Sequence, residues 1–128
     1  MIRFLDKKTL LVFHRDQLER NGGASGIRDE GLLESALAQL RAGYDRVYVH
    51  EDVYHMASAP GYHLCRHHPF YDGNKRTALI AMYLFLYVNG YQLVADKKSF
   101  YAIMIDLASG RVSKEEVIDY LKKHSRKS

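Results

Sequence analysis

The residues best suited to chemistry lie in one short segment, from Arg66 to Arg76, which reads Arg-His-His-Pro-Phe-Tyr-Asp-Gly-Asn-Lys-Arg. His68 is the strongest candidate for a general base, because an unperturbed imidazole titrates near neutral pH and can accept a hydroxyl proton. Asp72 is a hard oxygen ligand of the kind that shares Mg²⁺ with phosphate groups. The segment therefore predicts a nucleotide phosphate site with a proton acceptor beside it.

The segment leads into the expected start of a helix, because a long apolar run follows from Ala78 to Val88. Helix starts bind anions, since their free N–H groups and the positive end of the helix dipole point outward. Gly73 would let the backbone approach a phosphate closely. Asn74, Lys75 and Arg76 add an amide, an ammonium and a guanidinium, and the guanidinium can grip two phosphate oxygens.

Each of these residues also has an ordinary structural explanation. A single histidine in a helical protein is more often structural than catalytic, an Asp before Gly-Asn often only caps a turn, and a Lys-Arg pair is usually solvated surface. All of them lie in one loop and one helix start, so the structural explanation requires several coincidences. The pattern Gly-x-x-x-x-Gly-Lys-Ser/Thr is absent, which excludes a Walker loop.

The bulk composition indicates one globular domain spanning residues 1–128, with 47% hydrophobic residues and no charge block. A net charge of +4 suits phosphate or acidic partners but does not indicate direct binding of nucleic acid. The apolar run is well short of the ~20 residues that span a bilayer, so we expect no membrane segment. The single cysteine, Cys65, is expected in the core, and the lack of a disulfide or an apolar signal sequence predicts a cytoplasmic protein.

The pattern of apolar residues and helix caps predicts an all-α fold, a compact bundle of about six helices. The first helix is expected to be capped by Asp6 and to end at about Arg20, before Asn-Gly-Gly, and the second to be capped by Asp29 and to end at Gly43. The third is expected from about Asp52 to His67 and the fourth from about Asn74 to Asn89-Gly90. The fifth is expected to be capped by Asp96 and to end at Gly110, and the sixth to begin with a capping box at Ser113 to Glu116.

Three segments depart from this pattern. Residues 46–50 read Arg-Val-Tyr-Val-His, which alternates polar and apolar types and predicts a short extended segment or flap. Pro60-Gly61 predicts a kink or a late start in the third helix. The basic C-terminus with Lys122, Lys123, Arg126 and Lys127 is expected to be a frayed tail.

The sequence resembles the Fic/Doc family, and in particular its Doc (death-on-curing) branch of toxins from toxin–antitoxin modules. His-Pro-Phe-x-Asp-Gly-Asn-Lys-Arg at 68–76 is similar to the family signature. The likeness extends to Asn-Gly-Gly at 21–23, Gly-Ile-Arg-Asp-Glu-Gly-Leu-Leu-Glu-Ser-Ala-Leu at 26–37 and Leu-Tyr-Val-Asn-Gly-Tyr at 86–91. It covers nearly the whole chain.

The resemblance implies a flap over the site and a reaction that consumes a nucleotide to modify a protein hydroxyl. His68 would deprotonate the acceptor, Asp72 would hold Mg²⁺, and residues 74–76 would form the anion site for ATP. Arg66, two residues before His68, matches a basic position in the Doc branch and would touch phosphate.

Two positions separate the possible activities. Family members that transfer AMP have Gly where this chain has Lys75, and a second Arg where it has Leu79. The resemblance therefore favours a kinase that transfers the γ-phosphate of ATP, as Doc proteins do to a threonine of elongation factor Tu, which arrests translation. The alternatives are AMP transfer to a protein hydroxyl and an inactive module that only binds nucleotide or an antitoxin.

Inhibition is expected to come from a separate antitoxin. Self-inhibited relatives carry a Ser/Thr-x-x-x-Glu-Gly/Asn helix, and the nearest match here, Ser25 to Glu30, is one residue too long. The antitoxin would place a disordered segment in a groove of this protein. His63 and His67, four residues apart, could share a helix face and bind zinc, but packing or surface roles are more common for such a pair.

Overall fold

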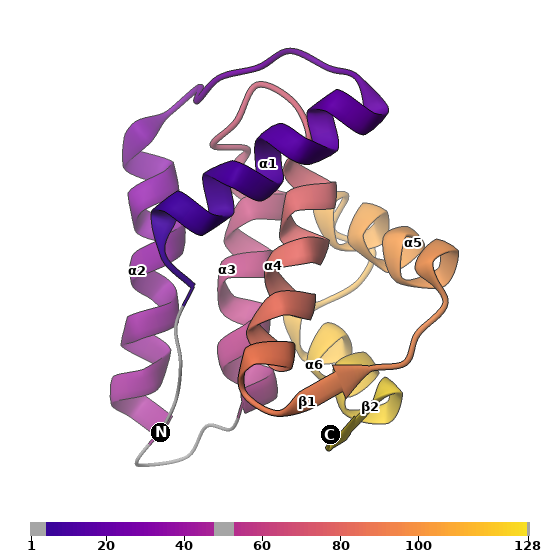
Figure 1. Cartoon of the computed structure of the whole chain (residues 1–128). Coiled ribbons are helices and arrows are strands. Elements are labelled where there is room, and N and C mark those ends of the chain that lie inside the picture. Colours follow the sequence, from indigo (N-terminus) through magenta and orange to yellow (C-terminus); the bar gives the residue numbers. More distant parts are fainter. Residues whose placement is uncertain (1–4, 48–52, 128) are drawn as a thin grey trace.

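The computed structural model describes residues 5–47 and 53–127, and in these ranges six helices form a bundle with a two-stranded ribbon at one edge (Figure 1). The prediction of a compact all-α fold is confirmed. The elements are, in chain order, α1 (Lys7–Asn21), α2 (Glu30–Val47), α3 (Val53–His67), α4 (Asn74–Val88), β1 (Tyr91–Leu93), α5 (Lys97–Ala108), α6 (Lys114–His124) and β2 (Ser125–Lys127).

The expected caps open their helices. Asp6 accepts a hydrogen bond from the N–H of Thr9 at 2.7 Å, and Asp96 accepts one from Ser99 at 3.2 Å. Ser113 and Glu116 form the predicted capping box at the start of α6. Because each cap satisfies N–H groups that the helix cannot, it fixes where the helix begins.

Helices α3 and α4 lie side by side at the centre and make the most extensive contact in the fold (Figure 1). Their facing side chains are fully buried and include Leu64, Phe85 and Met82. Full burial of such a side chain contributes ~1.5–3 kcal/mol, so this pair supports the loop that joins it. That loop carries the candidate site.

Pro60 and Gly61 lie inside α3, so of the two outcomes predicted there, a kink or a late start, the late start is wrong. Gly61 packs directly against α4, where a Cβ atom at this position would lie 2.6 Å from the sulfur of Met82. The missing side chain lets the two central helices approach closely. Tertiary packing therefore overrides the helix-breaking tendency of the Pro-Gly pair.

Helix α2 continues past Gly43 to Val47, so the predicted helix end at Gly43 is wrong. Arg46 and Val47, expected in an extended flap, belong to the last turn of α2. A glycine inside a helix costs only about 1 kcal/mol, which flanking helix formers can offset. The rest of the expected flap, residues 48–50, lies outside the described residues.

The C-terminal segment is not frayed as predicted, because Ser125–Lys127 forms strand β2 and pairs antiparallel with β1. The register places Tyr91 opposite Lys127 and Leu93 opposite Ser125, and the N–H of Val94 donates to the carbonyl of His124. Backbone hydrogen bonds with a distant strand hold the chain here, and composition alone does not reveal such pairing.

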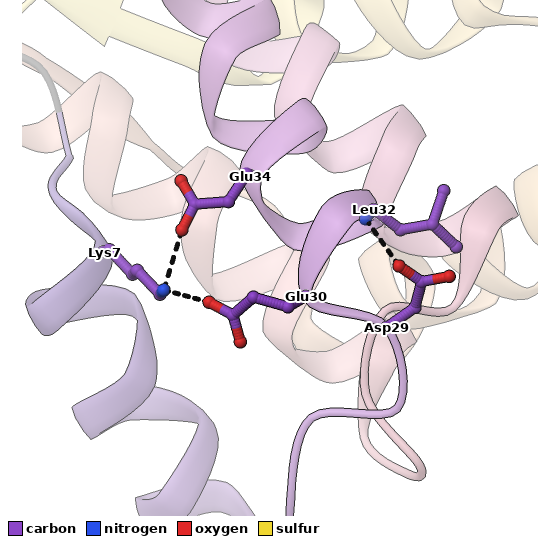
Figure 2. Close-up of polar contacts among 5 residues, drawn as sticks. All are labelled: Lys7, Asp29, Glu30, Leu32 and Glu34. Carbon is purple, nitrogen blue, oxygen red and sulfur yellow. Dashed lines mark hydrogen bonds and ion pairs between the residues drawn. The ribbon is translucent and has the colours of Figure 1, made fainter.

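An ion-pair cluster joins the start of α1 to the start of α2 (Figure 2). The ammonium of Lys7 contacts the carboxylates of Glu30 and Glu34, while Asp29 caps α2 by accepting from the N–H of Leu32 at 3.0 Å. Exposed pairs contribute little to stability. They tie down the end of the loop between α1 and α2, which continues toward the candidate site.

The single cysteine lies in the core, as expected. Cys65 is fully buried, and burial raises the pKa of its thiol to about 12, so this cysteine is a core residue without nucleophilic character. Within the described ranges, none of the helices combines the length and the apolar character required to cross a membrane.

Candidate active site

A polar cavity of about 520 Å³ opens where the loop between α3 and α4 meets the end of α1 and the start of α5. It brings together six of the seven residues singled out as site candidates. The residues that line it are Gln17, Asn21, Gly22, Gly23, His68, Tyr71, Asp72, Gly73, Asn74, Lys75, Arg76 and Tyr101.

The motif loop, residues 68–73, is anchored by Phe70, whose side chain is fully buried. The amide of Asn74 brackets this residue: its Nδ2 donates to the carbonyl of Phe70 and its Oδ1 accepts from the N–H of Phe70, both at 3.0 Å. The side chain of Asn74 is thus engaged in closing the loop. Its part in an anion site would come from its backbone N–H at the start of α4.

The bracing loop, residues 22–29, runs alongside the motif loop and forms a strip of backbone hydrogen bonds with it (Figure 1). The N–H of Tyr71 donates to the carbonyl of Gly26, and Ile27 and Phe70 form an antiparallel bridge. The N–H groups of Arg28 and Asp29 both donate to the carbonyl of Pro69, at 2.7 and 3.0 Å. The motif loop is therefore held by a segment that precedes it by about forty residues.

His68 is exposed at the rim of the cavity and has a left-handed backbone, with φ of 51°. It is the one non-glycine residue with positive φ in the described ranges, a conformation that costs roughly 1–2 kcal/mol. Partial burial lowers the pKa of its imidazole, and the positive charges of Lys75 and Arg28 and the neighbouring His67 lower it further. The neutral ring, which is the form that accepts a proton, is thereby favoured.

Asp72 is held at its backbone and at its side chain. The Nε2–H of His14 donates to the Asp72 carbonyl at 2.9 Å, and the N–H of Ala24 donates to the carboxylate at 2.7 Å. The His14 ring also stacks on Phe70, with ring centroids 3.7 Å apart and an interplanar angle of 13°. The hydrogen bond from Ala24 thus fixes the orientation of the Asp72 carboxylate through its Oδ2 atom.

The donor set around Asp72 suits Mg²⁺ only if the ion also has ligands from outside the protein. Within the described residues, no group of three or more His, Cys, Asp or Glu side chains could hold a metal by itself. A single exposed carboxylate beside an anion site fits Mg²⁺ that takes its other ligands from phosphates and water. Asp72 is the residue that would hold it.

The start of α4 forms the floor of the cavity. Gly73 is its N-cap residue, with φ of 80°, and provides no side chain to cap the first turn. A Cβ atom at Gly73 would lie 1.8 Å from Nε2 of Gln17, so any side chain there would have to displace the amide of Gln17. Gln17 is itself only 4% exposed, and its Nε2 has no partner in the described part of the chain.

Lys75 and Arg76 provide the positive charge of the cavity. The guanidinium of Arg76 lies over the ring of Tyr101, 4.5 Å from the centroid, so that α5 orients this side chain. The site therefore combines a neutral imidazole, one carboxylate and two cations around an open helix start. Such a set can accept a hydroxyl proton and stabilise a phosphoryl group.

Arg66 is the candidate that the structure does not bring to the cavity. Its Nη1 lies 3.4 Å from the carbonyl of Leu107 at the end of α5, and its guanidinium lies over the ring of Tyr62. The last turn of α3 turns this side chain away from the motif loop. Arg66 therefore does not line the polar cavity, and its contact with phosphate stays a prediction.

His63 and His67 do lie close together, with their Nδ1 atoms 3.2 Å apart. Among the described residues they have no third ligand that would complete a zinc site. Both rings pack near Tyr62 at the end of α3. The packing explanation of this pair therefore fits better than a zinc site.

The Fic/DOC family model matches residues 4–86, which include the motif loop, the bracing loop, α3 and most of α4. This chain belongs to the Fic/DOC family. It is 31% identical over 124 residues to "Protein kinase doc" of Escherichia phage P1, a match that covers 95% of each chain. It is also 38% identical to "Toxin Doc" of Mycolicibacterium smegmatis over 96 residues, which are 75% of this chain and 72% of the relative.

Several residues that line or support this Fic/DOC site lie outside the signature and were not identified as site residues from the sequence. They include His14 and Gln17 in α1, Arg28 in the bracing loop and Tyr101 in α5. The apolar spacing of α1 did suggest that His14 faces inward, and it is buried. No sequence signal linked these residues to the motif, because each contact joins segments far apart along the chain.

Proposed function

We propose that this Fic/DOC protein is a Doc-type toxin that acts as a protein kinase. It would transfer the γ-phosphate of ATP to a serine or threonine hydroxyl of a protein, with elongation factor Tu as the expected target and arrest of translation as the consequence. The observation that carries the proposal is the convergence of His68, Asp72, Lys75 and Arg76 on one polar cavity. The similarity to a protein kinase along 95% of the chain supports it.

In the proposed reaction, the acceptor oxygen attacks the γ-phosphorus while the bond to the bridging oxygen breaks and ADP leaves. His68 takes the hydroxyl proton, and the lowered pKa of its imidazole keeps it ready to do so at neutral pH. Lys75 and Arg76 stabilise the charge on the transferring group. Asp72 would hold Mg²⁺, which when bound neutralises phosphate charge.

Two side chains favour γ-phosphate transfer over AMP transfer. Lys75 lines the polar cavity, where a smaller residue would leave room for a phosphate deeper in the site. Leu79, which occupies the position of a second arginine in AMP-transferring relatives, lines an apolar groove on the other side of α4. A guanidinium grip on a second phosphate is therefore lacking at that position.

ATP labelled at the α- or the γ-phosphate distinguishes the activities. The purified protein is incubated with Mg²⁺ and either label, first with a bacterial lysate and then with purified elongation factor Tu. We expect γ-label to be retained on protein and α-label to be released. Retention of the α-label would instead establish AMP transfer, and binding of ATP with no label on any protein would indicate an inactive module.

We further propose that an antitoxin segment binds the apolar groove, a cavity of about 490 Å³ between α1, α4 and α5. Ile80, Tyr83 and Leu84 of α4 are among its lining residues, and it shares Arg76 with the polar cavity. The charged residues that line the groove carry a net positive charge, because there are three cations and one carboxylate: Arg20, Arg76, Lys97 and Asp16. An acidic segment with an apolar face would match this surface and reach the catalytic residues.

Co-expression with the product of the neighbouring small reading frame tests the antitoxin. We expect the two proteins to co-purify and the complex to show no γ-phosphate transfer. Tyr83→Asp, which places a carboxylate in the groove, should prevent co-purification, whereas Tyr87→Asp, also on α4 but outside the groove, should not. Equal binding by both variants would place the antitoxin elsewhere.

A further inference from the structure

Arg28 contacts three successive carbonyl groups at the entrance of the motif loop. Its Nε donates to the carbonyl of His68 at 2.7 Å and its Nη2 donates to the carbonyl of His67 at 2.8 Å. Its backbone N–H donates to the carbonyl of Pro69 at 2.7 Å. Among the described residues, Arg28 is the one whose side chain donates a hydrogen bond to the backbone carbonyl of His68, the candidate base.

These contacts fall where the chain leaves helical geometry. His67 ends α3, and His68 has φ of 51°. A helix end leaves carbonyl groups without partners, and a planar guanidinium is suited to bind two of them at once. A left-handed backbone at a residue other than glycine persists only when its surroundings hold it. The guanidinium of Arg28 gives these carbonyl groups a donor and at the same time holds the left-handed backbone of His68.

We propose that Arg28 is a positioning residue for the candidate base: by holding the carbonyls of His67 and His68, it keeps the His68 backbone left-handed and its ring at the cavity. This inference rests on the proposed function in assigning the base to His68. It goes beyond that function because Arg28 lies outside the signature and does not line the cavity. Arg28 acts through His68 and touches neither nucleotide nor acceptor.

Arg28 also acts on His68 through its charge. The positive groups that face the imidazole are Lys75 at the start of α4, Arg28 in the bracing loop and the adjacent His67, and each lowers the pKa of His68. Geometry and charge can be separated because lysine keeps the charge but cannot form the two-pronged contact. Methionine removes both while it keeps an unbranched side chain of similar reach.

The test compares Arg28→Lys and Arg28→Met with Arg15→Met, which changes an exposed arginine on α1 outside the cavity. Three quantities are measured: the pKa of His68 by NMR titration, the HN–Hα coupling that reports its φ, and the rate of phosphoryl transfer against pH. The melting temperature of each variant shows whether it is folded at the temperature of the assay.

Both Arg28 variants should lower kcat about ten- to hundredfold with little change in KM for ATP, because the base moves while the phosphate site stays in place. Their His68 coupling should move away from the left-handed value. Arg28→Met alone should raise the pKa of His68 and shift the acid limb of the rate profile to higher pH. Arg15→Met should match the wild type in every measurement.

Full kcat in folded Arg28→Lys, or an unchanged His68 coupling in both variants, would overturn the proposal and leave Arg28 as a cap of α3. The NMR measurements do not require the protein to transfer γ-phosphate. If the wild type transfers AMP or no group at all, the coupling and the pKa of His68 still decide whether Arg28 holds this residue. Failure of the proposed function is therefore distinguishable from failure of this inference.

Discussion

The polar cavity and the apolar groove share a wall but are built in opposite ways. The two have Gln17, Asn21, Arg76 and Tyr101 in common. The groove is formed mainly by faces of three regular helices, α1, α4 and α5, whose residues need no unusual backbone. The cavity depends on an irregular loop with left-handed residues at both ends, His68 and Gly73. The reactive groups of the cavity are therefore positioned by individual hydrogen bonds and packing contacts, each of which a single substitution can remove.

The comparison teaches that substitutions in the two regions should differ in kind. In the groove, a changed side chain alters a surface but leaves the backbone of α4 in place. In the cavity, a change to a supporting residue moves groups that it does not touch. Four substitutions, taken from the largest expected effect on activity or stability to the smallest, test this difference.

The largest loss is expected for His68→Ala, which removes the candidate base. Because general-base catalysis contributes roughly 10²–10⁴ to a rate, γ-phosphate transfer should fall by that factor. The exposed side chain makes little packing contact, so the melting temperature should stay near that of the wild type. Transfer is measured with γ-labelled ATP. His67→Ala is the control variant, because it removes the same type of side chain one position away. Wild-type transfer by folded His68→Ala would refute the role of this histidine.

Gly73→Ala should reduce both stability and transfer. The new Cβ would lie 1.8 Å from Nε2 of Gln17 and would require φ of 80°, so strain and steric overlap combine. We expect a loss of roughly 1–3 kcal/mol in the free energy of unfolding, measured with urea. Gly22→Ala is the matched control, because Gly22 has nearly the same φ of 79° but open space around it. Equal losses in the two variants would show that the contact with Gln17 has no influence.

His14→Phe should have an intermediate effect that depends on pH. The new ring can still stack on Phe70, but the carbonyl of Asp72 loses its donor, which costs roughly 1–3 kcal/mol in the free energy of unfolding. In the wild type, burial lowers the pKa of His14, although its bond to Asp72 opposes this. The unfolded ring therefore binds protons below about pH 6.5 while the folded ring resists them.

It follows that the wild type loses stability as the pH falls from about 6.5 toward the folded pKa of His14, and His14→Phe should lose less over the same interval. Urea unfolding at pH 7.5, 6.5 and 5.5 measures this. The remaining slope in the variant should come from His63 and His68, whose pKa values are also lowered by burial. An identical slope in both proteins would mean that His14 does not stay neutral when folded.

Tyr83→Ser in the groove should affect activity least. Tyr83 is 38% exposed on the outer face of α4, so its removal should change the free energy of unfolding by less than about 1 kcal/mol. Transfer from γ-labelled ATP should remain within about twofold of the wild type, because α4 keeps its backbone and the cavity its residues. A tenfold loss in a steady-state assay would show that groove and cavity are coupled through their shared wall.

Local signals predicted much of the helical framework and the content of the site. Asp6, Asp96 and Ser113 cap helices that begin where the sequence indicated, because a cap acts within one turn. The signature residues are consecutive, so their convergence on one cavity required only that the loop close. Phe70 provides that closure by filling the core, as its apolar side chain predicted.

The errors arise where distant segments decide the outcome. The β1–β2 ribbon was missed because its strands are short and more than thirty residues apart. The contact of Arg66 with the carbonyl of Leu107 in α5 was likewise not foreseen, while its predicted role in phosphate binding stays a prediction. The supporting roles of His14, Gln17 and Arg28 could not be read from local pattern, since each depends on how α1 and the bracing loop pack on the motif loop.

The span of these supporting contacts has a consequence for how the protein is made. The bonds from Arg28, Ala24 and His14 to the motif loop join residues 40, 48 and 58 positions apart. Contacts of such sequence separation form only after local helices have condensed, because closing the intervening chain costs entropy. All three bonds join the motif loop to residues that precede it, so the chain holds every one of these partners once the motif loop has left the ribosome. For a protein proposed to stop translation, activity would begin with tertiary folding.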